Sequence, residues 1–299
     1  MDPNPKRFNN IMKQTLNSNL TERQFSFTEK DFECIRKLIY SHAGISLSPA
    51  KKDMVYSRLV RRIRDLGFNS FHTYLSLLEN GDKTEWELFI NSLTTNLTSF
   101  FREEHHFEIL YDHINKHRNR TPINIWCSAS STGEEPYSIA MTIVDLYGSY
   151  QSPVKIYASD VDTNVLAKAK EGIYTIDRLE KMPQQKIRRF FKNGVGENQG
   201  KVRVRQELRD MITFIHVNLL DEAWPLNGPF DAIFCRNVMI YFDKPTQYNI
   251  LKKFAPLLKE DGLMFAGHSE SFLHAADLFK LRGKTVYELA DQKCKAYGK

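Results

Sequence analysis

The chain is poor in cysteine and has no long apolar stretch, and both absences limit what it can be. Four cysteines occur in 299 residues, and they are far apart with no C-x-x-C pair. This spacing argues against a disulfide framework or a zinc site and is typical of a reduced cytosolic protein. No run of about 18 apolar residues is present, and so the sequence predicts no membrane span.

The N-terminus is typical of a tail rather than of a sorting signal. It is polar and rich in asparagine, and it lacks the apolar core of a secretory signal peptide. We expect flexible tails at residues 1–22 and 291–299. The net charge of +6 is modest and suits acidic partners, but it does not by itself indicate nucleic-acid binding.

Helical periodicity dominates the first third of the chain. A capping-box pattern, Thr28 to Asp31, begins the first predicted helix, and Gly44 ends it. Further helices are predicted at 49–66, 70–79, 84–93 and 103–117. The polar stretch KHRNRTP follows, and we place a domain boundary there, between a helical domain of residues 23–120 and a second domain of residues 121–290.

Short apolar strands alternate with helices in the second domain. The predicted strands are INIWCS, VKIYASD, ITFIHVN, DAIFCRN and LMFAGHS, with helices at 136–147, 163–170 and 245–258. This alternation predicts an α/β fold, a doubly wound sheet with crossover connections. The segment FKLRGKTVYEL has a short internal turn and predicts an antiparallel hairpin at the sheet edge.

Residues about 173–210 interrupt this alternation. They hold ten Lys/Arg and five Asp/Glu, a net charge of +5. The pattern predicts a helix followed by a small antiparallel insertion.

The segment SASSTGEEPYS follows one predicted strand and begins a helix. Small-residue loops at helix N-termini usually bind phosphate, yet Glu134 and Glu135 would repel it. The plain interpretation is that carboxylates suit a first helical turn and that Thr132 and Glu135 form a capping box. If Glu134 instead binds a ligand, that ligand should be cationic or rich in hydroxyl donors.

Further polar residues end the next strands. Asp160 could be a helix N-cap, but an acid at this point of a doubly wound sheet typically binds the ribose hydroxyls of an adenine nucleoside. S-adenosylmethionine joins adenosine to a cationic amino-acid tail, and so it fits both Asp160 and Glu134. Arg236 and Asn237 follow a third strand, ahead of Tyr241, and are well placed for function. The alternatives are a structural salt bridge for Arg236 and a half-buried core position for Tyr241.

Six motifs occur in an order that resembles one family: NLTSFFRE, STGEEPYS, ASDVD, VNLL, FCRNVMIYFDK and GHSES. Over roughly residues 25–290 the sequence is similar to the chemotaxis receptor glutamate O-methyltransferases, the CheR type. The resemblance implies an all-helical N-terminal domain, a Rossmann-like S-adenosylmethionine-dependent methyltransferase domain and a small antiparallel β-subdomain insertion. It also implies methylation of glutamate side chains on membrane chemoreceptors for sensory adaptation, which leaves S-adenosylhomocysteine.

The same resemblance implies roles for individual residues. Arg102 is expected at the active site, and Tyr241 beside the transferred methyl group. Glu134 is expected to bind the methionine end of the cofactor, and Asp160 to hold its ribose. The other cofactor-binding positions implied in this way are Asn96, Thr98, Arg102, Asn218, Leu219, Arg236 and Asn237.

A basic helix face is a candidate docking site for the receptor. The predicted helix at 49–66 has an apolar stripe with basic residues along an adjacent face. Alone, this pattern would be interpreted as a solvated surface. With the resemblance, Arg58, Arg61 and Arg62 are expected to meet the acidic methylation region of a receptor.

The basic insertion is a second candidate contact. In part of the family the β-subdomain binds a peptide at the receptor's C-terminal end by strand addition, and other members lack this interaction. Gly194, Arg203 and Arg205 are compatible with such binding. We expect a cytoplasmic monomer that binds no nucleic acid and does not insert into a membrane.

The implied reaction requires no general base and no metal. A free glutamate has a pKa of about 4.3 and is already ionised at neutral pH. His105 and His106 should point about 100° apart on a helix and would not easily chelate one ion. Arg102 could orient a carboxylate, and Tyr241 could hydrogen-bond near the reacting oxygen.

Two other functions stay open at this point. One is a methyltransferase that acts on nucleic acid or on a small molecule, although the D/N-P-P-Y-type tetrapeptide of many amino-methylating enzymes is replaced here by CRNV. The other is a sensor that binds S-adenosylmethionine without turnover.

Overall fold

The structure is a computed structural model, and it describes residues 24–81 and 83–290. These residues divide into two compact units. One comprises the described residues up to Leu38 together with Ser48–Trp86, and the other comprises Ile39–Leu47 and the described residues from Glu87 on. The predicted tails lie outside the described residues. No helix within the described ranges is long and apolar enough to cross a membrane.

The first unit is helical. Its elements are the part of α2 (Glu29–Ala43) up to Leu38, η1 (Pro49–Lys51), α3 (Lys52–Asp65), α4 (Phe71–Glu79) and the start of α5 (Lys83–Leu93). The predicted capping box is confirmed, because the amide of Asp31 donates to Thr28 Oγ1 at 3.1 Å and the amide of Thr28 donates to Asp31 Oδ2 at 2.8 Å. The apolar stripe of α3 is fully buried, as hydrophobic periodicity requires.

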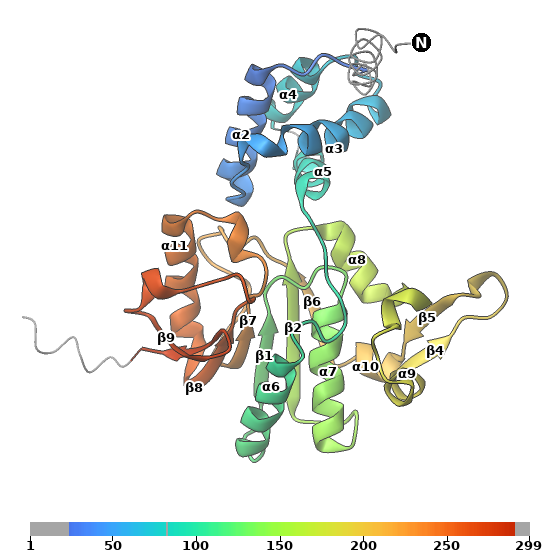
Figure 1. The fold of residues 1–299 in the computed structure, drawn as a ribbon, viewed down its shortest axis with the longest axis vertical. Helices are drawn as coiled ribbons and strands as arrows, with labels where there is room; N and C mark the ends of the chain where they lie inside the picture. The colour runs from blue at the N-terminus through green and yellow to red at the C-terminus, as the bar shows by residue number, and fades with distance from the viewer. Residues whose placement is uncertain (1–23, 82, 291–299) are drawn as a thin grey trace, which may run out of the picture. The chain divides into compact units, whose positions relative to one another are not determined.

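The second unit is built on a seven-stranded sheet (Figure 1). Its strands are β1 (Ile123–Cys127), β2 (Val154–Asp160), β6 (Ile212–His216), β7 (Phe230–Phe234), β8 (Leu258–Phe265), β9 (Phe279–Gly283) and β10 (Val286–Leu289). Their order is β6-β2-β1-β7-β8-β10-β9. The first five strands are parallel, and β10 is antiparallel to both of its neighbours. The predicted Rossmann-like sheet and its terminal hairpin are confirmed.

Helices cover the sheet and bury its two faces in separate cores. They are α6 (His105–Lys116), α7 (Glu134–Tyr147), α8 (Thr163–Glu171) and α11 (Lys244–Phe254). Alternate residues of β1 point to opposite faces, so Ile125 lies in the core shared with α6 and α7, whereas Trp126 lies in the core shared with α11. The helix predicted at 245–258 ends earlier, at Phe254, because Pro256 cannot donate the next helical hydrogen bond.

The insertion forms a separate three-stranded antiparallel sheet. Its elements are β3 (Ile173–Thr175), η2 (Ile176–Leu179), α9 (Gln184–Phe190), β4 (Phe191–Asn193), η3 (Gly196–Asn198), β5 (Lys201–Val204) and α10 (Gln206–Arg209). The strand order is β3-β5-β4. The predicted helix and antiparallel strands are present, but β3 precedes the helix and was not predicted, since three residues are too few for a periodic pattern.

The order of the parallel strands fixes where a ligand should bind. The chain passes from β1 to β2 on one side and later returns to β7 on the other side of β1. Ligands of doubly wound sheets lie at such a switch point, outside the carboxyl ends of the strands. The segments that follow β1, β2 and β7 therefore build the candidate site.

Candidate active site

The loop after β1 is shaped by a glycine at the start of α7. Gly133 is the N-cap residue and has a φ of 100°. A side chain at this position would place Cβ 2.8 Å from Tyr174 Oη and 3.0 Å from Ala169 Cβ, so both the backbone angle and the packing require glycine. The predicted capping box of Thr132 with Glu135 is wrong. Thr132 Oγ1 donates to Glu134 Oε2 at 2.6 Å instead, and Glu135 turns towards a buried arginine.

Glu134 is a fully buried carboxylate at the first position of α7. Its Oε2 accepts the hydrogen bond from Thr132, and its Oε1 forms an ion pair with Arg178 of the insertion. A buried carboxylate needs a cation or several hydrogen-bond donors, because it has lost its hydration. This position therefore suits a ligand with a positive charge.

Asp160 is the last residue of β2 and is 8% exposed. Its Oδ2 accepts from the amide of Ser131 at 2.8 Å, and its Oδ1 accepts from the amide of Asp162 at 3.0 Å. Burial raises the pKa of the Asp160 carboxyl to about 6. The alternative role as a helix cap does not hold, since Asp162 is the N-cap of α8 and accepts from the amides of Asn164 and Val165.

The segment around Asn96 is anchored next to this strand end. Asn96 Nδ2 donates to Asp162 Oδ2 at 2.9 Å, and its carbonyl accepts from Ser131 Oγ at 3.4 Å. Thr94 Oγ1 donates to the same Asp162 oxygen at 2.8 Å. The Asn96 side chain is thus engaged within the protein, and Thr98, two residues on, is half-buried.

Arg236 is buried, and three groups of this chain hold its guanidinium. Nη1 donates to Glu135 Oε2 at 2.5 Å, and Nη2 donates to the carbonyl of Arg102 at 2.5 Å. Nη2 also lies 3.4 Å from Glu103 Oε2. These contacts favour the structural interpretation of Arg236, in which its guanidinium positions Arg102 and does not bind a ligand directly.

A glutamate that sequence reasoning missed positions Asn237. The carboxylate of Glu270 accepts from the backbone amides of Asn237 at 2.9 Å, Met239 at 2.8 Å and Gly267 at 2.5 Å. A Cβ at Gly267 would lie 2.3 Å from Asn237 Nδ2, so only glycine allows this approach. Gly267 and Glu270 both belong to the motif GHSES, and this motif was the signal in the sequence that could have indicated their role.

Arg102 and Tyr241 are half-buried, and each side chain has one contact with a backbone carbonyl. Arg102 Nη1 donates to the carbonyl of Leu97 at 2.9 Å, and Tyr241 Oη donates weakly to the carbonyl of Thr95 at 3.4 Å. Both contacts are with the same short segment, which brings the two predicted catalytic side chains to one place.

Backbone strain gathers in these loops. Within the described ranges six non-glycine residues have a positive φ, and four of them flank the site: Phe101 (52°), Glu103 (56°), Ser131 (48°) and Asn237 (58°). Such conformations cost about 1–3 kcal/mol each and occur preferentially at functional sites.

The residues after β6 are less open to a ligand. Asn218 Nδ2 donates to the carbonyl of His42 at 2.6 Å, and its Oδ1 accepts from the amide of Leu220 at 3.0 Å. Leu219 is buried in the core that includes Trp126. The Asn218 amide therefore organises the loop, and the structure offers no separate sign of ligand contact there.

Glu103, His105 and His106 offer ligand atoms within 4.8 Å of one another, close enough to approach one metal ion. Two features oppose a cation at this point. His105 is the first residue of α6, where the helix dipole is positive, and Arg236 lies beside Glu103. Burial lowers the pKa of His106 to about 4, so its ring is neutral near pH 7, and this protonation state does not itself oppose a metal ion.

The predicted docking arginines of α3 differ in their surroundings. Arg62 contacts the buried Glu85 through Nε at 2.8 Å and Nη2 at 2.5 Å, and Tyr74 Oη donates to the same carboxylate at 2.9 Å. Arg61 is exposed and Arg58 is half-buried. Arg62 therefore stabilises its own unit, and Arg61 presents its charge to solvent.

The predicted peptide-binding residues of the insertion also have internal contacts. A Cβ at Gly194 would lie 2.1 Å from the carbonyl oxygen of Asn198, so the turn between β4 and β5 closes only around glycine. Arg203 Nε donates to the carbonyl of Glu171 at 3.1 Å, and Arg205 Nη2 donates to that of Arg188 at 3.3 Å.

The arrangement fits a nucleoside with a cationic tail. Asp160 is a buried carboxylate at the end of β2, and Glu134 is a buried carboxylate at the start of the helix that follows the neighbouring strand β1. Ser130 Oγ, in the loop between them, is buried and has no hydrogen-bond partner among the described residues. S-adenosylmethionine can satisfy all three, because it carries an ammonium group and ribose hydroxyls and has no phosphate.

Comparison with known proteins agrees with this geometry. Residues 30–94 match the family model described as the CheR methyltransferase all-alpha domain, and residues 96–288 match the CheR methyltransferase SAM binding domain. The chemotaxis protein methyltransferase of Escherichia coli (strain K12) is 53% identical over 272 residues, which cover 91% of this chain and 94% of that protein. Chemotaxis protein methyltransferase 2 of Pseudomonas aeruginosa is 51% identical, with 90% and 96% covered. The probable chemotaxis protein methyltransferase of Rhizobium etli is 41% identical, with 84% and 96% covered.

Both domain models match in sequence order and leave little of the described chain outside them. The predicted resemblance is thereby confirmed, and so is the fold of a helical domain followed by a methyltransferase sheet with a small antiparallel insertion. The chain belongs to the CheR methyltransferase family.

Proposed function

We propose that this protein transfers a methyl group from S-adenosylmethionine to glutamate side chains of chemotaxis receptors and so forms methyl esters. The observation that carries the proposal is the pair of buried carboxylates, Glu134 and Asp160, at the switch point of a chain that belongs to this family. Relatives at 51–53% identity are named chemotaxis protein methyltransferases over nearly their whole length. The methylated region of such receptors is cytoplasmic, and we place the protein there.

The two carboxylates have separate roles in cofactor binding. Glu134 is the acceptor for the ammonium of the methionine tail, since its charge is buried and needs a counter-ion. Asp160 accepts hydrogen bonds from the ribose hydroxyls at the end of β2. The bound cofactor supplies an electrophilic methyl group on a sulfonium.

The protein contributes alignment and exclusion of water rather than proton transfer. The substrate carboxylate is ionised near pH 7 and attacks without a general base or a metal. Arg102 orients this carboxylate, and Tyr241 hydrogen-bonds beside the reacting oxygen. Both side chains contact carbonyls of the segment 95–97. Correct alignment of two reactants can contribute several kcal/mol, about 7–11 in the best cases. The guanidinium of Arg236 positions Arg102 by donating to the backbone carbonyl of Arg102.

The exposed side of α3 is the proposed contact for the acidic methylation region. Arg61 and Arg58 provide the charge for this contact. Arg62 is a poorer candidate than the sequence indicated, because Glu85 already neutralises it.

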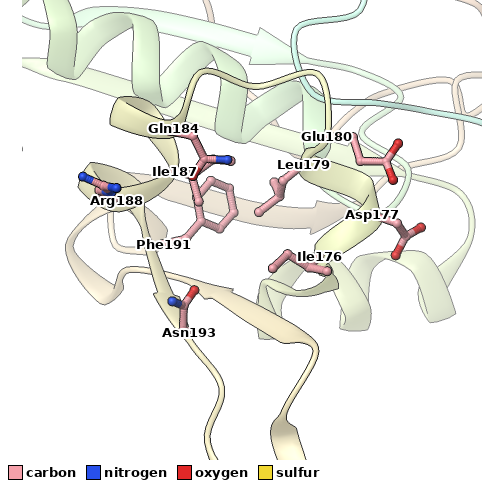
Figure 2. A pocket seen from close by; sticks show the side chains of 9 residues that line it. All are labelled: Ile176, Asp177, Leu179, Glu180, Gln184, Ile187, Arg188, Phe191 and Asn193. Atoms are coloured by element: carbon pink, nitrogen blue, oxygen red, sulfur yellow. The ribbon is translucent and has the colours of Figure 1, made fainter.

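The insertion supports a second contact, with a receptor C-terminal peptide. A hollow of about 630 Å³ is lined by residues of η2, α9 and β4. Figure 2 shows Leu179, Ile187 and Phe191 in its centre. Acidic side chains lie on its η2 side, and Arg188 lies on its α9 side. β4 is an edge strand of its sheet, so a peptide could add a strand and place an apolar side chain in the hollow.

The proposed function is tested by incubating the protein with methyl-labelled S-adenosylmethionine and a receptor cytoplasmic fragment, followed by mild alkali. Release of the label as methanol identifies a carboxyl methyl ester and supports the proposal. Label that survives alkali would indicate nitrogen methylation and a different substrate class. Cofactor binding without any labelled receptor would indicate a sensor.

A further inference from the structure

Arg178 occupies the position at which a bound cofactor would be expected to place its ammonium group. Its guanidinium pairs with Oε1 of Glu134, and the other oxygen of Glu134 is used by Thr132. Glu134 has no exposed surface, whereas the Arg178 side chain is 36% exposed. The arginine therefore reaches from the surface to a carboxylate that is otherwise enclosed.

The segment that carries Arg178 contacts the cofactor loop at a second point. Arg178 belongs to η2, which follows β3 of the insertion directly. Tyr174 of β3 donates from Oη to the carbonyl of Thr132 at 2.7 Å. The hydroxyl of Tyr174 is also the atom that a side chain at Gly133 would strike. The insertion is thus tied to the loop by one neutral hydrogen bond and one ion pair.

Electrostatics explains why the ion pair forms without a ligand. A carboxylate with no exposed surface is strongly destabilised when it has no counter-ion. Among the described residues, Arg178 is the cation paired with Glu134. The same oxygen cannot hold the guanidinium and an ammonium group in the same place, since both are full cations that would repel each other.

We propose that Arg178 is an internal counter-ion that competes with the cofactor's ammonium group for Glu134 and is displaced when S-adenosylmethionine binds. This inference rests on the proposed function, in which Glu134 receives the methionine tail. Displacement requires no movement of the sheet, because the Arg178 side chain already lies partly in solvent. The competition lowers the affinity for the complete cofactor and leaves the affinity for the nucleoside part unchanged.

Isothermal titration calorimetry on Arg178→Ala, with two ligands, tests the competition. S-adenosylmethionine carries the ammonium group, and 5′-methylthioadenosine has the same nucleoside with a neutral thioether and no amino-acid tail. Partly exposed ion pairs are weak, so S-adenosylmethionine should bind about three- to tenfold more tightly to the variant. The affinity for 5′-methylthioadenosine should not change. Lys181→Ala is the matched control, because it removes one exposed positive charge from the same subdomain.

Repeating the Arg178→Ala substitution in a Glu134→Gln variant separates loss of competition from misfolding. In Glu134→Gln the carboxylate charge is absent, so Arg178→Ala should have no effect on the binding of S-adenosylmethionine there. Weaker or unchanged binding of S-adenosylmethionine to Arg178→Ala, in a variant that still binds 5′-methylthioadenosine, would overturn the inference. Failure of the unmodified protein to bind S-adenosylmethionine would instead refute the proposed function.

Discussion

Replacing Arg236 by methionine tests whether this arginine stabilises the site or binds the cofactor directly. Its guanidinium is fully buried and pairs with Glu135 at 2.5 Å. The substitution keeps an apolar stem of similar length, but among the described residues it leaves the Glu135 carboxylate with the thiol of Cys127 as its side-chain donor, at 3.2 Å. Glu103 loses the contact of its Oε2 with Arg236 and keeps the contact of its Oε1 with His268 at 2.9 Å.

The buried Glu135 carboxylate thus loses its counter-ion and Glu103 loses its ion pair with Arg236, and the expected loss in the free energy of unfolding is about 3–5 kcal/mol. Since stable domains have about 5–15 kcal/mol in total, this loss is large but need not abolish folding. Urea unfolding followed by tryptophan fluorescence measures it, because Trp126 is fully buried in the same sheet. The midpoint should fall by roughly 1–2 M urea with an unchanged slope.

A second substitution should restore much of this loss. In the double variant Arg236→Met/Glu135→Gln the buried charge at position 135 is also removed, so we expect recovery of at least about 1.5 kcal/mol. A loss below about 1 kcal/mol in the single variant would refute the reasoning. A stable single variant that no longer binds S-adenosylmethionine would show that Arg236 contacts the cofactor, as the resemblance predicted.

Three further predictions follow from individual contacts. The pKa of Asp160 is about 6 without ligand, and the ribose hydroxyls donate to its ionised form. Calorimetry should therefore show that the affinity for S-adenosylmethionine falls below pH 6, by at most about tenfold per pH unit. The variant Asp160→Asn should remove this pH dependence. Arg61→Glu should slow receptor methylation without changing thermal stability, whereas Arg62→Glu should lower stability, and the reverse pattern would contradict the assignment. Gly267→Ala should displace Asn237 and weaken cofactor binding measured by calorimetry, and unchanged binding would show that this contact does not matter.

The sequence predicted the elements that depend on short-range patterns. The strand VKIYASD, the capping box at Thr28 and the terminal hairpin each have a local signature, and each is present. The alternation of strands and helices predicted the doubly wound sheet, and it placed Asp160 at a strand end and Glu134 at the start of the helix after the neighbouring strand. The strand β3 was missed because three residues carry no period.

Contacts between distant residues had no such signature. Arg178 reaches Glu134 across 44 residues, and Arg236 reaches Glu135 across 101. The place of Arg236 after a strand suggested a salt bridge but not its partner, and nothing in the local sequence distinguishes Arg178 from a solvated arginine. The failed capping box has the same cause, because a buried arginine competes for Glu135 more strongly than a helix amide does.

The most direct test of the account is to locate the transferred methyl group. The protein is incubated with a receptor cytoplasmic fragment and S-adenosylmethionine that carries a trideuterated methyl group, and the receptor peptides are sequenced by tandem mass spectrometry. The account predicts one trideuteromethyl group on individual glutamate side chains, lost after mild alkali and absent when the cofactor is omitted. The same label on lysine, arginine or a terminal amine, or on no receptor peptide at all, would contradict it.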